Sequence, residues 1–251
     1  MGTWGTGLFA DDMARDVRDA YRDHIGDGLS GLAATDALLH EYAEQLDDSD
    51  GGPVFWLALA ATQWRLGRLE DRVKAKALTI IASRADLRRW QDDPRGLKRR
   101  EAVLVKLAEQ LQSPQPTAKR VAKPFRNSTD WEVGEIVTYR LTSGNLAVFR
   151  VIGSHSDRGG TAPVAELLDW RAPDAPSPAE LKRLGLMPRI HERAPGSRNQ
   201  VLLGRVSARE FPADRVVRTG VKLEPSQPAG GFTVLLWKHM DMLLEKLFGI
   251  A

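Results

Sequence analysis

The chain has 251 residues, of which 42% are hydrophobic and 27% are charged, and its formal net charge is +3. This composition is typical of folded globular proteins, and the length suits two domains. Cysteine is absent, which excludes disulfides, thiolate nucleophiles, cysteine-based zinc fingers and iron–sulfur clusters.

The absence of cysteine also fits a reducing compartment. No segment approaches the roughly 20 apolar residues needed to cross a bilayer, and no early segment has the pattern of a signal peptide. We therefore expect a bacterial-type cytoplasmic protein with no membrane partner.

Charge is distributed unevenly along the chain. Residues 1–50 hold 12 acidic and 3 basic residues, whereas residues 51–126 hold 7 acidic and 17 basic residues. Adjacent segments of opposite sign attract each other, and their fields partly cancel at a distance.

The first half of the chain is predicted to be helical. Apolar residues recur every four positions from Phe9 through Met13, Val17 and Tyr21 to Ile25, which indicates an amphipathic helix. Four more helices are expected at about residues 32–46, 53–66, 73–81 and 97–111 from the same periodicity. Residues 1–112 should therefore form an all-α helical bundle.

Residues 113–126, SPQPTAKRVAKPFR, combine three prolines with several basic side chains and few large apolar ones. Such a composition is typical of a linker, so we place the domain boundary here.

The apolar pattern changes to a period of two after this linker. The runs GEIVTYRL, LAVFRVIG and APVAELLDW are separated by TSGN and SHSDRGG, which have turn chemistry. An antiparallel meander is expected here, then a short helix capped by Ser177 and Glu180, strands at about 200–207, 215–218 and 232–236, and a C-terminal helix. Residues 127–251 should thus be an antiparallel-strand-rich α+β domain, curled like a small barrel.

The first residues, MGTWGTGLFADD, combine aromatic side chains with three glycines. A phosphate-binding loop is disfavoured because no strand can precede it and acidic residues follow it. We expect instead that Trp4 and Phe9 fill a groove between helices.

The same residues resemble the N-terminus of a bacterial family of unknown function. The shared pattern is W-G-x-G-x-F-x-x-D, here Trp4, Gly5, Gly7, Phe9 and Asp12. The resemblance covers about the first 110 residues and implies no catalytic residue.

The segment from DWEVGEIVTYRL to DRGGTAPVAELLDW resembles, more weakly, small β domains among the immunity proteins of bacterial toxin systems. A strand that opens with G-[DE] begins their sheet, and Gly134 and Glu135 match that pattern. This resemblance implies a protein partner and no catalytic residue.

The densest polar cluster is GSHSDRGG, which contains His155, Ser156, Asp157 and Arg158. A catalytic triad needs converging side chains, but neighbours in an extended segment point apart. A hairpin loop is the favoured interpretation and a ligand-contacting loop the next, with catalysis last.

Carboxylates three residues apart also occur. Glu166 and Asp169 form one such pair and Glu132 and Glu135 another, but in a strand such neighbours face opposite sides. A paired site could form only across strands. The histidines lack metal-ligand spacing, so no metal or cofactor is expected.

A run of basic side chains begins at residue 84 and continues into the linker. Positive side chains together with a flexible linker are what binding to phosphates uses. No recognition-helix or RNA-binding motif accompanies them, so a solvated face or internal pairing is the favoured interpretation, and binding of nucleic acid or another polyanion is the alternative. The candidate residues are Arg88, Arg89, Lys98, Arg99, Arg100, Lys119, Arg120 and Lys123.

The sequence as a whole predicts a non-enzymatic, immunity-like module that binds another protein through the surface around residues 155–160. Binding of a polyanion through residues 84–126 is the alternative prediction. A hydrolase-like enzyme with a site assembled from distant residues is the third.

Overall fold

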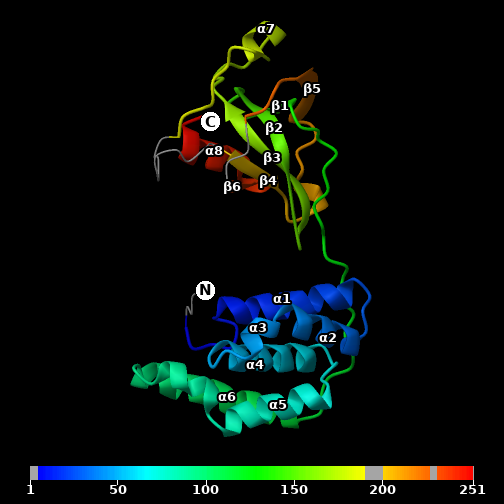
Figure 1. Ribbon diagram of the computed structural model, residues 1–251, viewed down its shortest axis with the longest axis vertical. Coiled ribbons are helices and arrows are strands. Elements are labelled where there is room, and N and C mark those ends of the chain that lie inside the picture. The colour runs from blue at the N-terminus through cyan, green and yellow to red at the C-terminus, as the bar shows by residue number, and fades with distance from the viewer. Residues whose placement is uncertain (1–4, 190–199, 227–230, 251) are drawn as a thin grey trace. The chain divides into compact units, whose positions relative to one another are not determined.

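The computed structural model describes residues 5–189, 200–226 and 231–250. The chain divides into two compact units, Met1–Pro124 and Phe125–Ala251, which we call the helical unit and the sheet unit. Figure 1 shows helices in the first and a sheet with helices in the second, which confirms the predicted α+β class.

The helical unit contains the helices expected from the apolar periodicity, with one difference. The helix predicted over residues 32–46 is interrupted at Tyr42, so that a short helix follows a longer one. The helices are α1 (Asp12–Gly26), α2 (Gly31–Glu41), α3 (Ala43–Leu46), α4 (Gly51–Arg65), α5 (Asp71–Ala82) and α6 (Pro94–Gln112), and a 3-10 helix, η1 (Ala85–Trp90), precedes α6.

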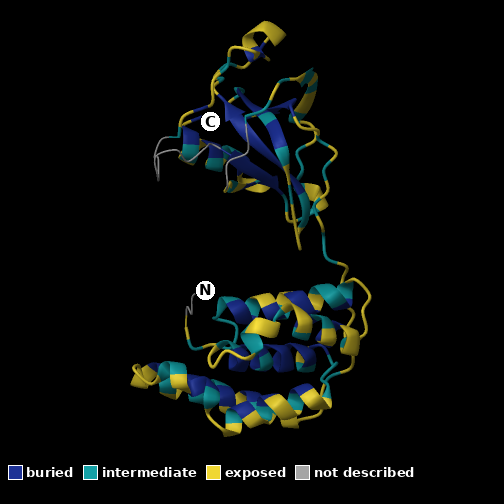
Figure 2. Ribbon diagram, in the orientation of Figure 1, coloured by how far each residue is buried: buried dark blue, intermediate teal, exposed yellow. Residues whose placement is uncertain are grey.

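The central helix of this unit is α4. Eleven of its fifteen residues are buried, including Phe55, Leu57 and Leu59, as its uniformly apolar sequence predicts. The buried stripe of α1, from Met13 to Ile25, packs in the same core. In Figure 2, α4 has mostly the colour of buried residues, whereas α1 alternates between the colours of buried and exposed residues.

The N-terminal motif is tied to this core at its phenylalanine. Phe9 is partly buried against the core, and the guanidinium of Arg65 lies 5.0 Å from its ring centre. Arg100 Nη1 donates to the carbonyl of Gly7 at 3.1 Å. The groove-filling role expected of Trp4 falls outside the described residues.

The segment predicted as a linker lies along the helical unit up to Pro124. The amide of Lys119 donates to the carbonyl of Leu66 at 2.9 Å, and Gln115 Oε1 accepts from the amide of Leu69 at 2.7 Å. Residues 113–124 therefore extend the helical unit beyond the boundary expected at residue 112.

The described residues of the sheet unit form six strands, two short α-helices and two 3-10 helices. Neighbouring strands follow the order β5-β1-β2-β3-β4-β6. The elements are β1 (Glu135–Arg140), β2 (Leu146–Asp157), β3 (Gly160–Leu168), α7 (Pro178–Leu181), β4 (Gln200–Gly204), the 3-10 helix η2 (Ala208–Glu210), β5 (Val216–Lys222), β6 (Thr233–Leu236), the 3-10 helix η3 (Trp237–His239) and α8 (Met240–Phe248).

Strands β1 to β3 form the antiparallel meander that the alternating pattern predicts, and β4 adds to it in the antiparallel direction. The capping box of Ser177 and Glu180 is present at α7. Two expectations need correction. The sheet is mixed because β6 runs parallel to β4, and it is open because β5 and β6 form its two edges. The barrel-like closure is therefore wrong.

Each face of the sheet carries an apolar layer. On one face, Phe149 and Leu167 pack with Leu244 and Phe248 of α8. On the other, Ile136 and neighbouring strand residues pack with α7. The sheet consequently appears as a buried layer in Figure 2.

Candidate functional site

The β2–β3 hairpin extends beyond the rest of the meander. Pairing between β1 and β2 ends at Arg150, whereas pairing between β2 and β3 continues to Asp157 and Gly160. The loop expected over residues 154–160 is therefore shorter than predicted, because His155 to Asp157 lie in β2 and the turn is at Arg158 and Gly159.

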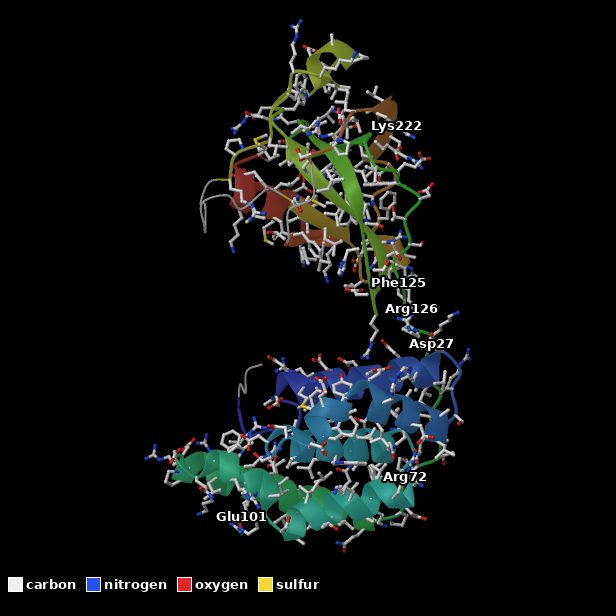
Figure 3. The ribbon with its side chains drawn as sticks, in the orientation of Figure 1. Asp27, Arg72, Glu101, Phe125, Arg126 and Lys222 are labelled. Atoms are coloured by element: carbon white, nitrogen blue, oxygen red, sulfur yellow. The ribbon has the colours of Figure 1, made fainter. Side chains whose placement is uncertain are left out.

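Asn127 holds the tip of this hairpin. Its backbone amide donates to the carbonyl of Gly159 at 2.6 Å, and its carbonyl accepts from the amide of Thr161 at 2.9 Å. Its side chain donates to the carbonyl of Arg205 at 2.9 Å and accepts from the amide of Arg205 at 3.2 Å. Arg126, which is labelled in Figure 3, donates a further hydrogen bond to the carbonyl of Arg158. The hairpin is thus fixed by the residues that enter the sheet unit.

A groove of about 340 Å³ lies beside the hairpin, and we call it the hairpin groove. Its wall is largely apolar, and two of its valines, Val206 and Val234, are 55% and 50% exposed. Isolated exposed apolar residues are common, but several on one groove mark an interaction surface. Its lining includes Phe125, His155, Asp157, Leu202, Val206 and Val234.

The polar cluster of the hairpin is divided between two faces. His155 and Asp157 line the groove, with His155 Nε2 at 3.8 Å from Asp157 Oδ2. Ser156 between them bonds instead to the hydroxyl of Thr161 at 2.8 Å. Strand alternation therefore separates the serine from the histidine and aspartate, so these three side chains do not form a triad.

The ring of His155 also packs on Phe232, at 4.9 Å between ring centres. Arg158, the fourth candidate, is exposed at the turn. The predicted partner-binding residues thus lie on one hairpin but not on one face.

The carboxylates considered for a paired acid–base site are paired with cations. Glu166 is buried and forms an ion pair with Arg150 across β2 and β3. Glu135 pairs with Arg218, and Glu132 pairs with Lys222. None of these three contacts joins two carboxylates.

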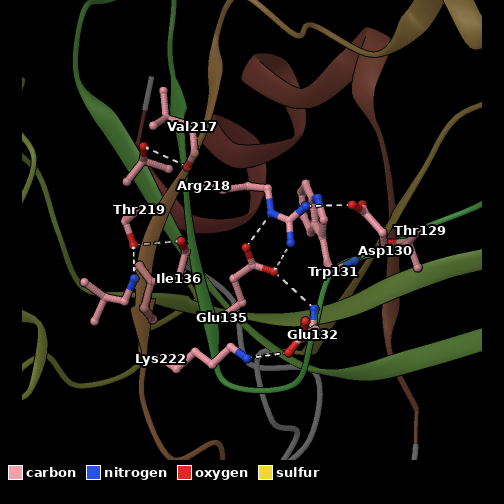
Figure 4. Close-up of polar contacts among 12 residues, drawn as sticks. Thr129, Asp130, Trp131, Glu132, Glu135, Ile136, Val217, Arg218, Thr219 and Lys222 are labelled. Atoms are coloured by element: carbon pink, nitrogen blue, oxygen red, sulfur yellow. Dashed lines mark hydrogen bonds and ion pairs between the residues drawn. The ribbon is translucent and has the colours of Figure 1, made fainter.

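Figure 4 shows the network around Glu135. Arg218 donates to both oxygens of Glu135, with Nη2 to Oε2 at 3.0 Å, and its Nη1 donates to Asp130 at 2.7 Å. Burial alone raises the pKa of Glu135, but the hydrogen bonds from Arg218 and from the amide of Glu132 outweigh it and leave that pKa below its usual value.

Asp241 joins α8 to the sheet. It accepts from the hydroxyl of Tyr139 at 2.7 Å, the amide of Thr142 at 2.7 Å and Nη2 of Arg215 at 2.8 Å. Burial raises the pKa of Asp241, but these donors outweigh it and hold the pKa well below its ordinary value. Tyr139 has a raised pKa because burial and the Asp241 carboxylate both disfavour its ionised form.

Two of the candidate polyanion-binding residues are engaged inside the helical unit. Arg100 is buried and pairs with both oxygens of buried Asp86, at 2.6 and 2.9 Å. Arg89 Nη2 donates to Asp11 at 2.6 Å. The internal pairing expected from the charge distribution applies to these two arginines, which are removed from the candidate surface.

The remaining six candidates are exposed, and no ion pair joins them to any described residue. They form two groups. Arg88, Lys98 and Arg99 lie in η1 and the first turns of α6, whereas residues 119–123 follow the other end of α6. Fourteen residues of helix separate Lys98 from Gln112, or about 21 Å. The basic run is therefore not one patch.

No group of three or more His, Cys, Asp or Glu side chains that could hold a metal ion occurs in the described ranges. No helix there is long and apolar enough to span a membrane. No family model, curated protein or solved structure matches the chain significantly, so its candidate sites depend on geometry alone.

Proposed function

We propose that this chain is a non-enzymatic binding module that recognises a protein partner through the hairpin groove. The observation that carries this proposal is the exposure of Val206 and Val234 together on one groove beside a hairpin fixed by Asn127. An extended segment of a partner can bury aliphatic side chains against these valines while His155 and Asp157 provide polar contacts at the rim.

Two further features support a protein as the partner. The hairpin backbone is fixed by hydrogen bonds before any partner binds, which lowers the ordering cost of association. The resemblance of the segment around Gly134 and Glu135 to immunity-protein domains points to the same class of ligand.

The test uses a partner captured from the native cell with the full chain and then purified. Val234→Asp places a charge in the groove and should weaken binding of that partner at least tenfold, because a desolvated charge has no counterpart there. Val217→Asp is the matched control, since Val217 is 57% exposed but lies on β5 outside the groove. Equal effects of the two variants, at unchanged melting temperature, would place the interface elsewhere.

A second candidate function is binding of a polyanion. The observation that favours it is the set of exposed basic residues without ion pairs to described residues, namely Arg88, Lys98, Arg99, Lys119, Arg120 and Lys123. Binding of this kind should be lost between about 50 and 200 mM salt.

The polyanion test is retention of the full chain on immobilised heparin along a salt gradient. Reversal of Lys98 and Arg99 to glutamate should abolish retention if the group on α6 carries it. Arg100 is left unchanged, because its reversal would break the buried pair with Asp86 and unfold the helical unit. Elution of the unmodified chain at the lowest salt would remove this function.

A further inference from the structure

A second cavity, of about 270 Å³, lies on the face of the sheet opposite to the hairpin groove, and we call it the aromatic cavity. The two faces follow from strand alternation. Leu203 lines the aromatic cavity, whereas its neighbours Leu202 and Gly204 line the groove. The two spaces share three lining residues, Asn127, Ala162 and Arg205, but the exposed valines that carry the proposed protein binding line the groove and not this cavity.

Three aromatic side chains form one wall of the aromatic cavity. Trp131 and Phe211 both pack edge-on against Trp237, with ring centres 6.2 and 5.4 Å away. These rings come from the entry segment, the loop after η2 and η3, so they meet only in the fold. Such a wall can hold a further ring in an edge-on or offset contact.

Arg205 at the end of β4 supplies a positive charge to this cavity. Its guanidinium lies 5.3 Å from the ring centre of Phe125 and 5.6 Å from that of Phe211. No described residue accepts a hydrogen bond from this guanidinium or forms an ion pair with it. Two rings therefore position the group while its N–H donors keep their capacity to bind an acceptor.

The second arginine of the aromatic cavity is already neutralised. Arg218 is engaged by Glu135 and by Asp130, so its charge is compensated within the protein. Asp130 also lines the cavity and would repel a ligand that carries several negative charges. Arg218 and its two carboxylates therefore add no positive charge to the cavity. Arg205 is the cation of the lining that has no carboxylate partner among the described residues, so it can pair with one carboxylate of a ligand.

We infer that the aromatic cavity binds a carboxylate attached to an aromatic ring, with Arg205 as the partner of the carboxylate and Trp131, Phe211 and Trp237 as the wall for the ring. The planar guanidinium matches a carboxylate with two parallel hydrogen bonds. The volume lies just below the roughly 300–1,000 Å³ of sites for drug-sized molecules, and so suits a single-ring ligand. A free aromatic acid and the C-terminal aromatic residue of a polypeptide share this chemistry.

The experiment follows the indole N–H resonances of the full chain by NMR, with those of Trp131 and Trp237 assigned from Trp131→Phe and Trp237→Phe. Phenylacetate and a short acetylated peptide that ends in phenylalanine are the two carboxylate probes. The same peptide with an amidated terminus is the probe without the carboxylate. Saturable shifts of Trp131 and Trp237 are expected with a carboxylate probe and not with the amide. Shifts with phenylacetate alone identify a free acid as the ligand, and shifts with the peptide identify a chain terminus.

Arg205→Gln should weaken binding of the carboxylate at least tenfold, and Arg205→Lys should weaken it less because the positive charge remains. The matched control is Arg209→Gln, which changes a nearby exposed arginine outside the cavity and should leave binding unchanged. If Arg205→Gln lowers the melting temperature, the affinity of Arg205→Lys for the carboxylate probe is the deciding measurement. The inference is overturned if neither carboxylate produces a saturable shift, if the amide binds equally, or if the Arg205 variants bind as tightly as the unmodified chain.

Discussion

Two arginines, one in each unit, lie in opposite environments. In the helical unit, Arg100 is buried against Asp86 and its charge is neutralised by the fold. In the sheet unit, Arg205 is held by two aromatic rings and has no carboxylate partner among the described residues. A dense run of basic residues in the sequence is therefore a poor guide to anion binding. The contacts that each arginine makes in the fold are a better guide.

The largest expected effect is the loss of folding stability in Asp86→Ala, which tests the buried arginine of this comparison. The substitution leaves Arg100 buried without a carboxylate partner, and removal of one member of a buried ion pair costs about 3–5 kcal/mol. Urea denaturation followed by far-ultraviolet circular dichroism, which reports mainly the helices, measures the loss.

Two controls sharpen the result. Arg99→Ala changes an exposed neighbour on α6 and should alter stability by less than about 0.5 kcal/mol. The double variant Asp86→Leu with Arg100→Met removes both charges and should recover much of the loss. A loss below about 1 kcal/mol for Asp86→Ala would show that this buried ion pair does not stabilise the helical unit.

An intermediate effect is expected from Asp241→Asn in the sheet unit. The unmodified carboxylate has a lowered pKa in the fold, so its stabilisation is complete above its unfolded pKa of about 3.9 and is lost as the pH falls toward the folded value. The variant should lose about 2 kcal/mol at neutral pH, since hydrogen bonds to a charged acceptor weaken.

Acid titration of the near-ultraviolet circular dichroism, which reports aromatic packing around Trp237, separates this effect from a general loss of stability. The unmodified chain should lose stability more steeply below about pH 4 than Asp241→Asn does. Parallel acid curves would mean that Asp241 is not the titrating contact.

The smallest expected effect is a difference of about 1 kcal/mol between two glycine variants, and it tests how the hairpin is fixed. Gly160 has a φ of +97°, and a Cβ there would overlap the backbone of Asn127. Gly144 has a φ of +96° with nothing near the position of an added Cβ. Gly144→Ala should therefore cost about 1 kcal/mol from backbone strain alone, and Gly160→Ala about 2 kcal/mol.

The amide of Thr161 donates to the carbonyl of Asn127, so its rate of hydrogen exchange measures how firmly the hairpin tip is held. Exchange there should accelerate in Gly160→Ala and stay unchanged in Gly144→Ala. Equal protection in both variants would show that Asn127 does not hold the hairpin tip.

Much of the architecture is predictable from local patterns. The four-residue periodicity of α1, the buried composition of α4 and the capping box at Ser177 each depend on residues that are close in sequence. The division into a helical and a strand-rich half follows from the change of period near residue 127.

The features that local patterns did not predict depend on residues that are far apart in the sequence. Asn127 and Arg205 are 78 residues apart, and β6 pairs with β4 in parallel across a long connection. The continuation of β2 through His155 is enforced by pairing with β3, although SHSDRGG has turn chemistry. Arg205 belongs to no motif or dense basic run, so no sequence signal singled it out.

The central claim is that recognition belongs to the hairpin groove of the sheet unit. Its most direct test places a photo-crosslinking residue at position 155 or at position 99 of the full chain and adds the purified partner. The groove interface predicts a covalent adduct from position 155 and none from position 99. An adduct formed only from position 99 would contradict it and assign recognition to the helical unit.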